Sequence, residues 1–192
     1  MKQAFSFILI AMVTMSAMAQ TKKYDIKSAT ISFETTMKMS GMNIKEKVIV
    51  YFDDYGIKEC RDTYSDGKLK ESFFSDGKNL FTVVHKEKTA YNRGGAYRGT
   101  EMKFDWNEIS DKDKKGGKAK KLANTTVAGK PCESYEYTDG GTTSKYYGWN
   151  HVLLMSDIAM KDISNVTKAV KVDEKTPVPP EKFKAPAGYA VK

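Results

Sequence analysis

The sequence predicts a mainly β protein organised around an antiparallel meander with one apolar face. Three observations support this fold class. Residues 29–85 contain five short segments with strand-like patterns, turn signals separate these segments at hairpin spacing, and the chain contains one good helical pattern. Because consecutive strands usually lie next to each other in such sheets, sequential pairing is the expected topology.

The first two segments of the meander show which residues share its apolar face. In residues 29–39 the apolar side chains fall on one parity and the polar ones on the other, which is the period-two pattern of a strand with one solvated side. The second segment repeats this pattern less cleanly, because Ile49 and Tyr51 join lysines on its polar face. The apolar set on these two segments is Ala29, Ile31, Phe33, Met37 and Met39, followed by Val48, Val50 and Phe52.

The turns that follow give the meander its spacing. Residues 53–56, 65–68, 75–78 and 86–88 are rich in Asp, Gly, Ser and Lys. The Asp-Gly pairs in two of them can adopt the positive φ angles of the primed turns that join antiparallel strands. The meander is therefore expected to end near His85, with residues 89–92 as a sixth strand.

A helical pattern and further strands follow the meander. Met102, Trp106 and Ile109 lie at i, i+4 and i+7, which predicts a short amphipathic helix; the alternative is a loop. In both cases Trp106 is expected to cover apolar surface. The strand pattern returns in residues 122–127, 131–138, 142–149, 152–160 and 163–172, and prolines 177, 179 and 180 end it.

The beginning of the chain has the pattern of an export signal. A basic start precedes an apolar run over residues 4–19, and Ala17-Met18-Ala19 provides small residues at a cleavage site. The alternative, a membrane anchor, needs about 20 apolar residues, and this run is shorter. We therefore predict a signal peptide over residues 1–19, a single domain over residues 20–192, and an exported protein, periplasmic or secreted. No transmembrane segment is expected in the mature chain.

The charge of the chain constrains its partners. The sequence has 32 basic and 24 acidic residues, a net charge of +8, and its densest lysine cluster lies between Lys112 and Lys121. That cluster contains no aromatic residue on which a base could stack, so nucleic acid is not an expected partner. Two interpretations remain for the cluster, a solvated loop or a contact with phosphate head groups or another acidic partner.

The two cysteines also allow two interpretations. Cys60 and Cys132 would enter an oxidising compartment if the chain is exported, and a disulfide between them would stabilise the fold by restricting the unfolded chain. The alternative is two buried free thiols in separate strands.

Two short motifs resemble those of LolA-like exported bacterial proteins. Residues 178–189 contain a turn, Phe183 and then Pro186-Ala187-Gly188-Tyr189, and residues 129–135 match a Gly-x-x-Cys-x-x-Tyr segment of uncharacterised secreted relatives. The resemblance implies a strongly curved antiparallel sheet, an incomplete barrel whose concave side is capped by helix and loops. In LolA that cavity shelters the acyl chains of lipoproteins. This chain has fewer helical segments, and Arg61 and Arg93 match the carrier's functional arginine in residue type only.

Catalytic and metal-binding patterns are missing from the sequence. His85 and His151 have no second ligand at metal-binding spacing, and the calcium-like start at Asp111 has Lys115 at the third ligand position. Neither a Gly-x-Ser-x-Gly elbow nor a phosphate-binding glycine loop occurs. We therefore predict no catalytic residue, no cofactor and no metal, and a protein that is not an enzyme.

The predicted function follows from the apolar face. Each apolar side chain left exposed forgoes about 1.5–3 kcal/mol, so the face must be covered. If the chain covers it completely, the face is a core; if coverage is partial, an apolar ligand completes it, and flexible methionines favour this second interpretation. We expect an exported protein that binds a lipid or another apolar small molecule in a concave face. The alternative is a cell-envelope interaction module that docks a protein or polysaccharide through a strand edge or the lysine-rich loop. The predicted ligand-binding residues are Ile31, Phe33, Met37, Met39, Val48, Val50, Phe52, Trp106, Trp149 and Met155.

Overall fold

The computed structural model describes residues 22–95, 103–107 and 118–192. The predicted signal peptide, most of the predicted helix and most of the lysine-rich loop lie outside these residues. Strands dominate the described chain, and short 3-10 turns interrupt them, so the predicted mainly β class is confirmed. The strands are β1 (Ala29–Met39), β2 (Met42–Asp53), β3 (Lys58–Ser65), β4 (Lys68–Ser75), β5 (Leu80–Val84), β6 (Thr89–Asn92), β7 (Lys118–Lys121), β8 (Thr125–Val127), β9 (Lys130–Asp139), β10 (Thr142–Trp149), β11 (Val152–Met160), β12 (Ile163–Asp173) and β13 (Ala190–Val191), and the 3-10 turns are η1 (Asp54–Gly56), η2 (His85–Glu87) and η3 (Pro180–Phe183).

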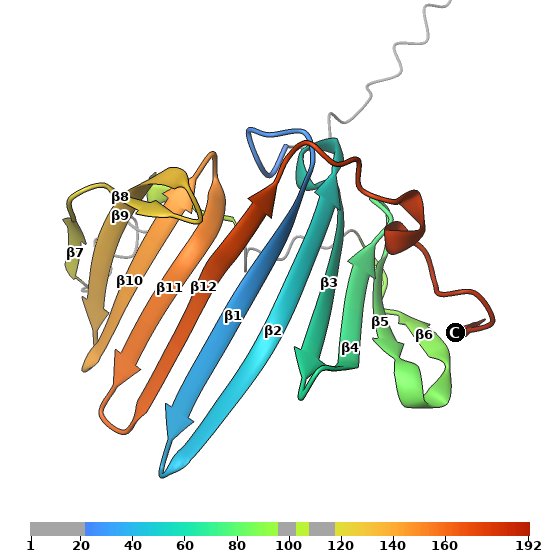
Figure 1. Ribbon diagram of the computed structural model, residues 1–192, viewed down its shortest axis with the longest axis horizontal. Coiled ribbons are helices and arrows are strands. Elements are labelled where there is room, and N and C mark those ends of the chain that lie inside the picture. Colours follow the sequence, from blue (N-terminus) through green and yellow to red (C-terminus); the bar gives the residue numbers. More distant parts are fainter. Residues whose placement is uncertain (1–21, 96–102, 108–117) are drawn as a thin grey trace, which may run out of the picture.

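One large sheet contains almost all of these strands (Figure 1). Its order is β13-β6-β5-β4-β3-β2-β1-β12-β11-β10-β9-β7, and β8 pairs with β9 beside this path. The predicted meander of five sequential antiparallel strands is therefore confirmed in β1 to β5, with β6 as the sixth strand. The second half of the chain forms another meander that joins the first through the antiparallel pair β1 and β12.

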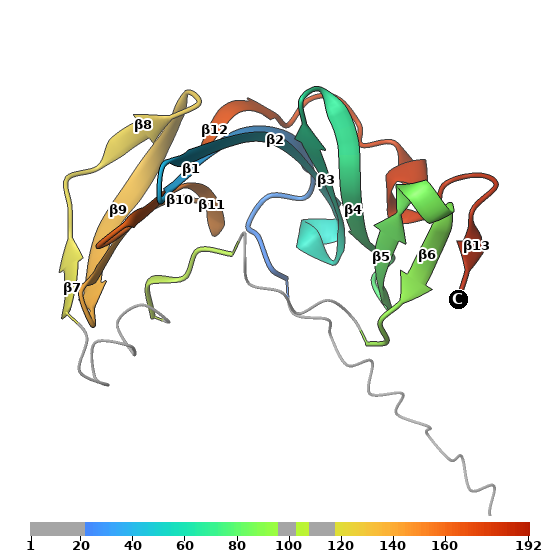
Figure 2. The same cartoon turned by 90° about the horizontal axis from the view of Figure 1, so that it is seen from below.

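The sheet is curved into an open arch, as seen in Figure 2. Residues 22–28, η1 and residues 103–107 lie on its inner, concave side, and η3 lies on its outer side. The sheet is not closed into a barrel, because the two end strands of its described part, β7 and β13, do not pair with each other. The curved, incomplete barrel that the resemblance implied is thus present, with turns and loops as its cover.

The strand register explains why the predicted apolar residues share one face. Ile31 is paired with Val50 and Phe33 with Val48, and directly opposite residues in adjacent strands point to the same side of a sheet. Tyr24, from the concave-side segment, packs its ring 4.6 Å from that of Phe52. The shared apolar face is therefore the concave face.

The turns between strands use the backbone conformations that the sequence indicated. Asp66 and Gly67 join β3 to β4 with φ angles of 52° and 73°, as a primed two-residue turn requires. Asn150 and His151 join β10 to β11 in the same way, with φ angles of 48° and 60°. This second turn has no glycine, so its conformation depends on residues that readily adopt positive φ.

The two cysteines lie far apart in the sheet. Cys60 is on β3 and Cys132 on β9, with β2, β1, β12, β11 and β10 between them. Both are buried free thiols. Adjacent strands are spaced by about 4.8 Å, so this separation is far beyond the reach of a disulfide. The disulfide interpretation is therefore wrong, and the two free thiols are what the fold contains.

Candidate functional site

The concave face has two halves with different exposure. In the half nearest η1, five predicted ligand-binding residues are 0–3% exposed. They form one cluster with Tyr24, Val152 and Leu154, which belong to the segment before β1 and to β11. This half is packed as a hydrophobic core. The five residues are Ile31, Phe33, Val48, Val50 and Phe52.

The other half, toward the β1–β2 and β11–β12 hairpins, is open. Met37 pairs with Ile44 across β2 and with Asn165 across β12, while Met39 pairs with Met42 and Ile163. On the next strand, β11, Ile158 pairs with Asn165 and Met160 pairs with Ile163. The exposed fractions are 52% for Met42, 40% for Ile44 and 47% for Met160. We call this set the methionine patch: Met37, Met39, Met42, Ile44, Ile158, Met160 and Ile163.

One polar atom in the patch lacks a partner. Asn165 lies between Met37 and Ile158 in the sheet, and its Oδ1 is shielded from solvent but accepts no hydrogen bond from any described residue. A buried acceptor without a donor costs about 1–3 kcal/mol. The patch therefore combines apolar surface with one acceptor that a ligand hydroxyl or amide could satisfy.

The remaining predicted residues occupy different places. Trp149 and Met155 pack against the core cluster that contains Phe33 and Val50, as expected of covering residues. Trp106 covers apolar surface elsewhere: its ring stacks on Tyr135, 3.8 Å between centroids, in a separate cluster with Phe104. Trp106 and Asn107 are helical, and the rest of the predicted helix lies outside the described residues.

Sequence reasoning missed the other members of the patch. Ile158, Met160 and Ile163 belong to segments whose apolar parity could be read, but their position beside β1 follows from the β1–β12 pairing. Met42 and Ile44 continue the parity of Val48 along β2, and that parity was the available signal.

Arg61, which the resemblance singled out by residue type, lies elsewhere on the concave face. It pairs with Val50 and so points to the same side of the sheet. It lines a hollow of about 310 Å³ together with Phe73 and Leu80. Arg61 is therefore separate from the methionine patch.

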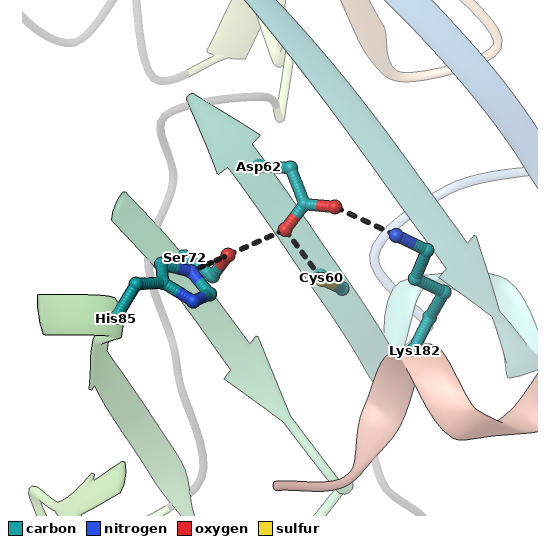
Figure 3. Close-up of polar contacts among 5 residues, drawn as sticks. All are labelled: Cys60, Asp62, Ser72, His85 and Lys182. Atoms are coloured by element: carbon teal, nitrogen blue, oxygen red, sulfur yellow. Dashed lines mark hydrogen bonds and ion pairs between the residues drawn. The ribbon is translucent and has the colours of Figure 1, made fainter. Parts of the chain in front are cut away.

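A polar cluster lies on the outer face, beneath the C-terminal segment (Figure 3). Asp62 is 4% exposed and accepts hydrogen bonds from Ser72 at 2.6 Å and from Lys182 at 2.7 Å. Cys60 lies 3.6 Å from the same carboxylate. His85 contacts Ser72 through Nε2 at 2.9 Å and the Tyr189 hydroxyl through Nδ1 at 3.1 Å.

This cluster holds Asp, Ser and His but lacks the geometry of an activated nucleophile. In a Ser-His-Asp triad the histidine stands between the other two and the serine hydroxyl is exposed to substrate. Here Ser72 stands between Asp62 and His85, is buried, and donates its proton to the carboxylate. The His85 Nε2–H must then donate to Ser72 Oγ, which leaves Nδ1 to accept from Tyr189. The cluster anchors the C-terminal segment to the sheet.

Charge and burial alter two groups of this cluster. Burial raises the pKa of the Cys60 thiol, and the negative charge of Asp62 raises it further. Partial burial alone would lower the pKa of Lys182, but the hydrogen bond and charge of Asp62 outweigh it, so this pKa is raised. Cys60 is consequently an unreactive thiol and Lys182 a persistent cation.

Among residues 22–95, 103–107 and 118–192, no group of three or more His, Cys, Asp or Glu side chains could hold a metal ion. No helix in that part of the chain is long and apolar enough to cross a membrane.

Comparisons with known proteins give likeness in fold. No family model and no curated protein matches the chain. The structure of MucB is similar over 88% of this chain and 61% of that chain, with 12% identity and a TM-score of 0.56. A chain of the Pseudomonas aeruginosa MucA/MucB complex gives 11% identity and a TM-score of 0.56 over 88% of this chain and 59% of that chain. An uncharacterized conserved protein from Thermus thermophilus matches over 84% of this chain and 89% of that chain, with 8% identity and a TM-score of 0.51.

These matches differ in how much of each protein they cover. The chain spans about three fifths of the length of MucB, whereas it spans most of the Thermus protein. A LolA superfamily protein from Nitrosomonas europaea is also a structural neighbour, with 7% identity and a TM-score of 0.47 over 85% of this chain and 92% of that chain. The structural neighbours therefore include a protein of the superfamily that the sequence motifs resemble. At these identities the likeness concerns the fold alone.

Proposed function

We propose that this protein is an exported, non-enzymatic binding protein that holds a lipid or another amphiphilic molecule against the methionine patch. The observation that carries the proposal is the exposure of Met42, Ile44 and Met160 together on the concave side of the arch. Each apolar side chain left in water forgoes about 1.5–3 kcal/mol. A ligand that covers three of them recovers a substantial part of that cost.

The shape and composition of the patch fit a flexible apolar chain. Concave apolar surfaces surround a small ligand better than flat ones do. Met37, Met39, Met42 and Met160 have unbranched side chains that can adapt to ligands of different shapes. Asn165 Oδ1 supplies an acceptor inside the patch for a hydroxyl or amide of the ligand. The proposed ligand class is therefore a lipid that carries a hydrogen-bond donor beside its acyl chain.

The predicted ligand-binding residues contribute differently to this proposal. Met37 and Met39 lie in the open half of the concave face and would touch the ligand directly. The five core residues from Ile31 to Phe52 would support that surface from the closed half, since they are covered by the protein itself. Ligand binding by any of them stays a prediction, as does the export that the first 19 residues suggest.

A lipid-binding measurement tests the proposal. The purified protein is titrated with 11-dansylaminoundecanoic acid, whose fluorescence rises in an apolar site, and bound lipids are identified by native mass spectrometry. The triple variant Met42→Ser/Ile44→Ser/Met160→Ser should lose about tenfold or more in affinity. A matched control, Leu69→Ser/Val170→Ser, removes two exposed apolar side chains outside the patch and should bind as the unchanged protein does. Equal affinity of the triple variant and the unchanged protein would contradict the proposal.

A second candidate function is docking of an envelope protein. MucB, which is similar in fold, has been solved in a complex with MucA(peri). For this chain, the edge strand β7 is short and contains Lys118, Lys120 and Lys121, a composition that discourages strand addition by a partner. Docking would then depend on attraction between the lysine side chains and an acidic partner, and not on pairing of a partner strand with β7. Pull-down with an acidic periplasmic peptide, with and without Lys118→Gln/Lys120→Gln/Lys121→Gln, distinguishes this function from lipid binding.

A further inference from the structure

Three of the ten methionines of the sequence lie within residues 37–42, at the tip of the β1–β2 hairpin. Met37 and Met39 are on β1, and Met42 begins β2. Met37 and Met39 are two positions apart in an extended strand, so both side chains project to the concave face. Met42 is paired with Met39 and therefore projects to the same face. The hairpin tip thus gathers three thioether sulfurs on one surface.

The turn at the hairpin tip sets the spacing of these side chains. Ser40 and Gly41 have φ angles of 44° and 83°, as a primed two-residue turn requires. Met39 and Met42 flank this turn, and the Cβ atoms of such directly opposite residues lie about 4.5–5.5 Å apart. Met37 lies two residues, or about 6.8 Å, before Met39 along β1. Because each methionine side chain has three rotatable bonds, the three Sδ atoms can turn toward a common point.

This group of thioethers is accessible and has no neighbouring charge from its own hairpin. Met42 is 52% exposed, and Met37 and Met39 are half-buried. Lys38 and Lys45 have the opposite strand parity and project to the outer face. The methionine patch, as defined above, contains no ionisable side chain. A cation that approached from the concave side would therefore meet the sulfurs without repulsion from these ammonium groups.

The chemistry of the donors favours one class of ion. Thioether sulfur is a soft, uncharged donor, and soft sulfur ligands select Cu(I). Zn²⁺ is held by thiolates, imidazoles and carboxylates, and Mg²⁺ and Ca²⁺ require oxygen, none of which the three side chains offer. Covering apolar surface would not by itself call for methionine, because isoleucine and valine do so and are better strand formers. Sulfur is the property that distinguishes these three positions.

We propose that Met37, Met39 and Met42 form a binding site for a soft monovalent metal ion, Cu(I). Each residue would contribute one Sδ atom to a three-coordinate site. A thioether has no proton to lose, so binding would release none, in contrast to binding by cysteine or histidine. The sequence-based expectation of no metal considered histidine and carboxylate ligands, and this site departs from it. The proposal does not depend on lipid binding, although a lipid would contact the same side chains.

Methyl NMR tests the site at the residues concerned. The full chain, with ¹³C-labelled methionine methyl groups, is titrated with Ag(I), a redox-stable ion of the same class, and with Cu(I) kept reduced by ascorbate. We expect saturable shifts of the three methyl resonances, assigned with single Met→Leu variants, and equal affinity at about pH 7.5 and about pH 5.5. Zn²⁺ and Mg²⁺ should leave these resonances unchanged. No saturable shift with either soft ion, an equal response to Zn²⁺, or loss of binding at the lower pH would overturn the proposal.

Matched leucine variants test the role of sulfur. Met39→Leu/Met42→Leu keeps a similar apolar volume but removes two thioethers, so the saturable Ag(I) response at Met37 should disappear. The remaining methyl resonances report whether this variant is folded. Met155→Leu removes a thioether outside the patch and should leave the Ag(I) response unchanged. An Ag(I) response at Met37 that survives Met39→Leu/Met42→Leu would contradict the proposed site.

A second variant separates the metal site from the lipid site. Ile44→Ser/Ile163→Ser removes apolar surface from the patch but no sulfur. It should weaken binding of the dansyl fatty acid and leave the Ag(I) response of the three methionines intact. Loss of the Ag(I) response in this folded variant would show that sulfur does not determine the site, and the metal proposal would fail.

Discussion

The Lys182 ammonium nitrogen lies 2.7 Å from Asp62 Oδ2 and joins the C-terminal segment to β3 across the outer face (Figure 3). Asp62 is buried, and Lys182 is the cation that compensates its charge. The nearby Phe183 is buried in a hydrophobic cluster on the same outer face, together with Cys60, Phe74 and Phe81. One ion pair and one aromatic anchor therefore fasten the last residues of the chain to its first meander.

Removing the cation of this pair should destabilise the fold. Lys182→Met leaves the Asp62 carboxylate buried without its partner, and we expect a loss of about 2–3 kcal/mol in the free energy of unfolding, below the cost for a fully buried pair because Lys182 is partly exposed. Urea unfolding measures this loss. The double variant Asp62→Asn/Lys182→Met should lose less stability than the sum of the losses measured for the two single variants. A loss equal to that sum would show that the pair does not interact.

The same pair predicts a dependence of stability on alkaline pH. The pKa of Lys182 is raised in the folded protein above its ordinary value of 10.5, because Asp62 outweighs the effect of burial. A raised pKa of a base stabilises the fold fully below the unfolded value, and this contribution is lost as the pH rises through the folded value. The difference in stability between the unchanged protein and Lys182→Met should thus be constant at neutral pH and decrease above 10.5. A difference that already declines between neutral pH and about pH 9 would contradict this assignment.

The two halves of the concave face should respond differently to truncation. Phe33→Ala removes a buried ring from the core half and should cost about 3–5 kcal/mol. Met42→Ser alters an exposed side chain of the open half and should change stability by no more than about 0.5 kcal/mol. Thermal unfolding of the two variants measures this contrast. A large loss for Met42→Ser would mean that the methionine patch is covered in solution.

The approach of Phe104 to Gly148 gives a prediction about how residues 103–107 pack on β10. Gly148→Ala places a methyl group into the Phe104 ring and should destabilise the protein by about 1–3 kcal/mol through overpacking. The double variant Phe104→Ala/Gly148→Ala removes the clash. Its loss in the free energy of unfolding should therefore be smaller than the sum of the losses of the two single variants. Chemical unfolding followed by tryptophan emission measures both effects. Additive losses would show that residues 103–107 do not rest on β10.

The cysteines should remain free and slow to react. Burial raises the pKa of both thiols, and the negative charge of Asp62 raises that of Cys60 further, so few thiolates form at neutral pH. We expect thiol reagents to label both cysteines in urea. In the folded protein both should be labelled much more slowly. Reductant should leave the thermal midpoint unchanged. An intact mass lacking two hydrogens would reveal the disulfide that the strand order excludes.

Local sequence patterns determined the elements of this protein and the orientation of their side chains. The alternation from Ala29 to Met39 specified a one-sided strand, because neighbouring side chains in an extended chain point in opposite directions. Asp66-Gly67 specified a hairpin turn, since few residues tolerate positive φ. The closing motif around Phe183 indicated a curved, incomplete barrel, and the structure contains a curved sheet that is not closed.

Only the tertiary structure decided which surfaces meet. The β1–β12 pairing joins residues more than a hundred positions apart, and it alone brings Met160 and Ile163 beside Met37 and Met39. Periodicity gives the face of a side chain but not the element that covers it. For this reason the sequence left open whether Phe33 and Val50 lie in a core, and whether Cys60 could reach Cys132. The close approach of Phe104 to Gly148 likewise depends on a contact between distant segments, which no local pattern encodes.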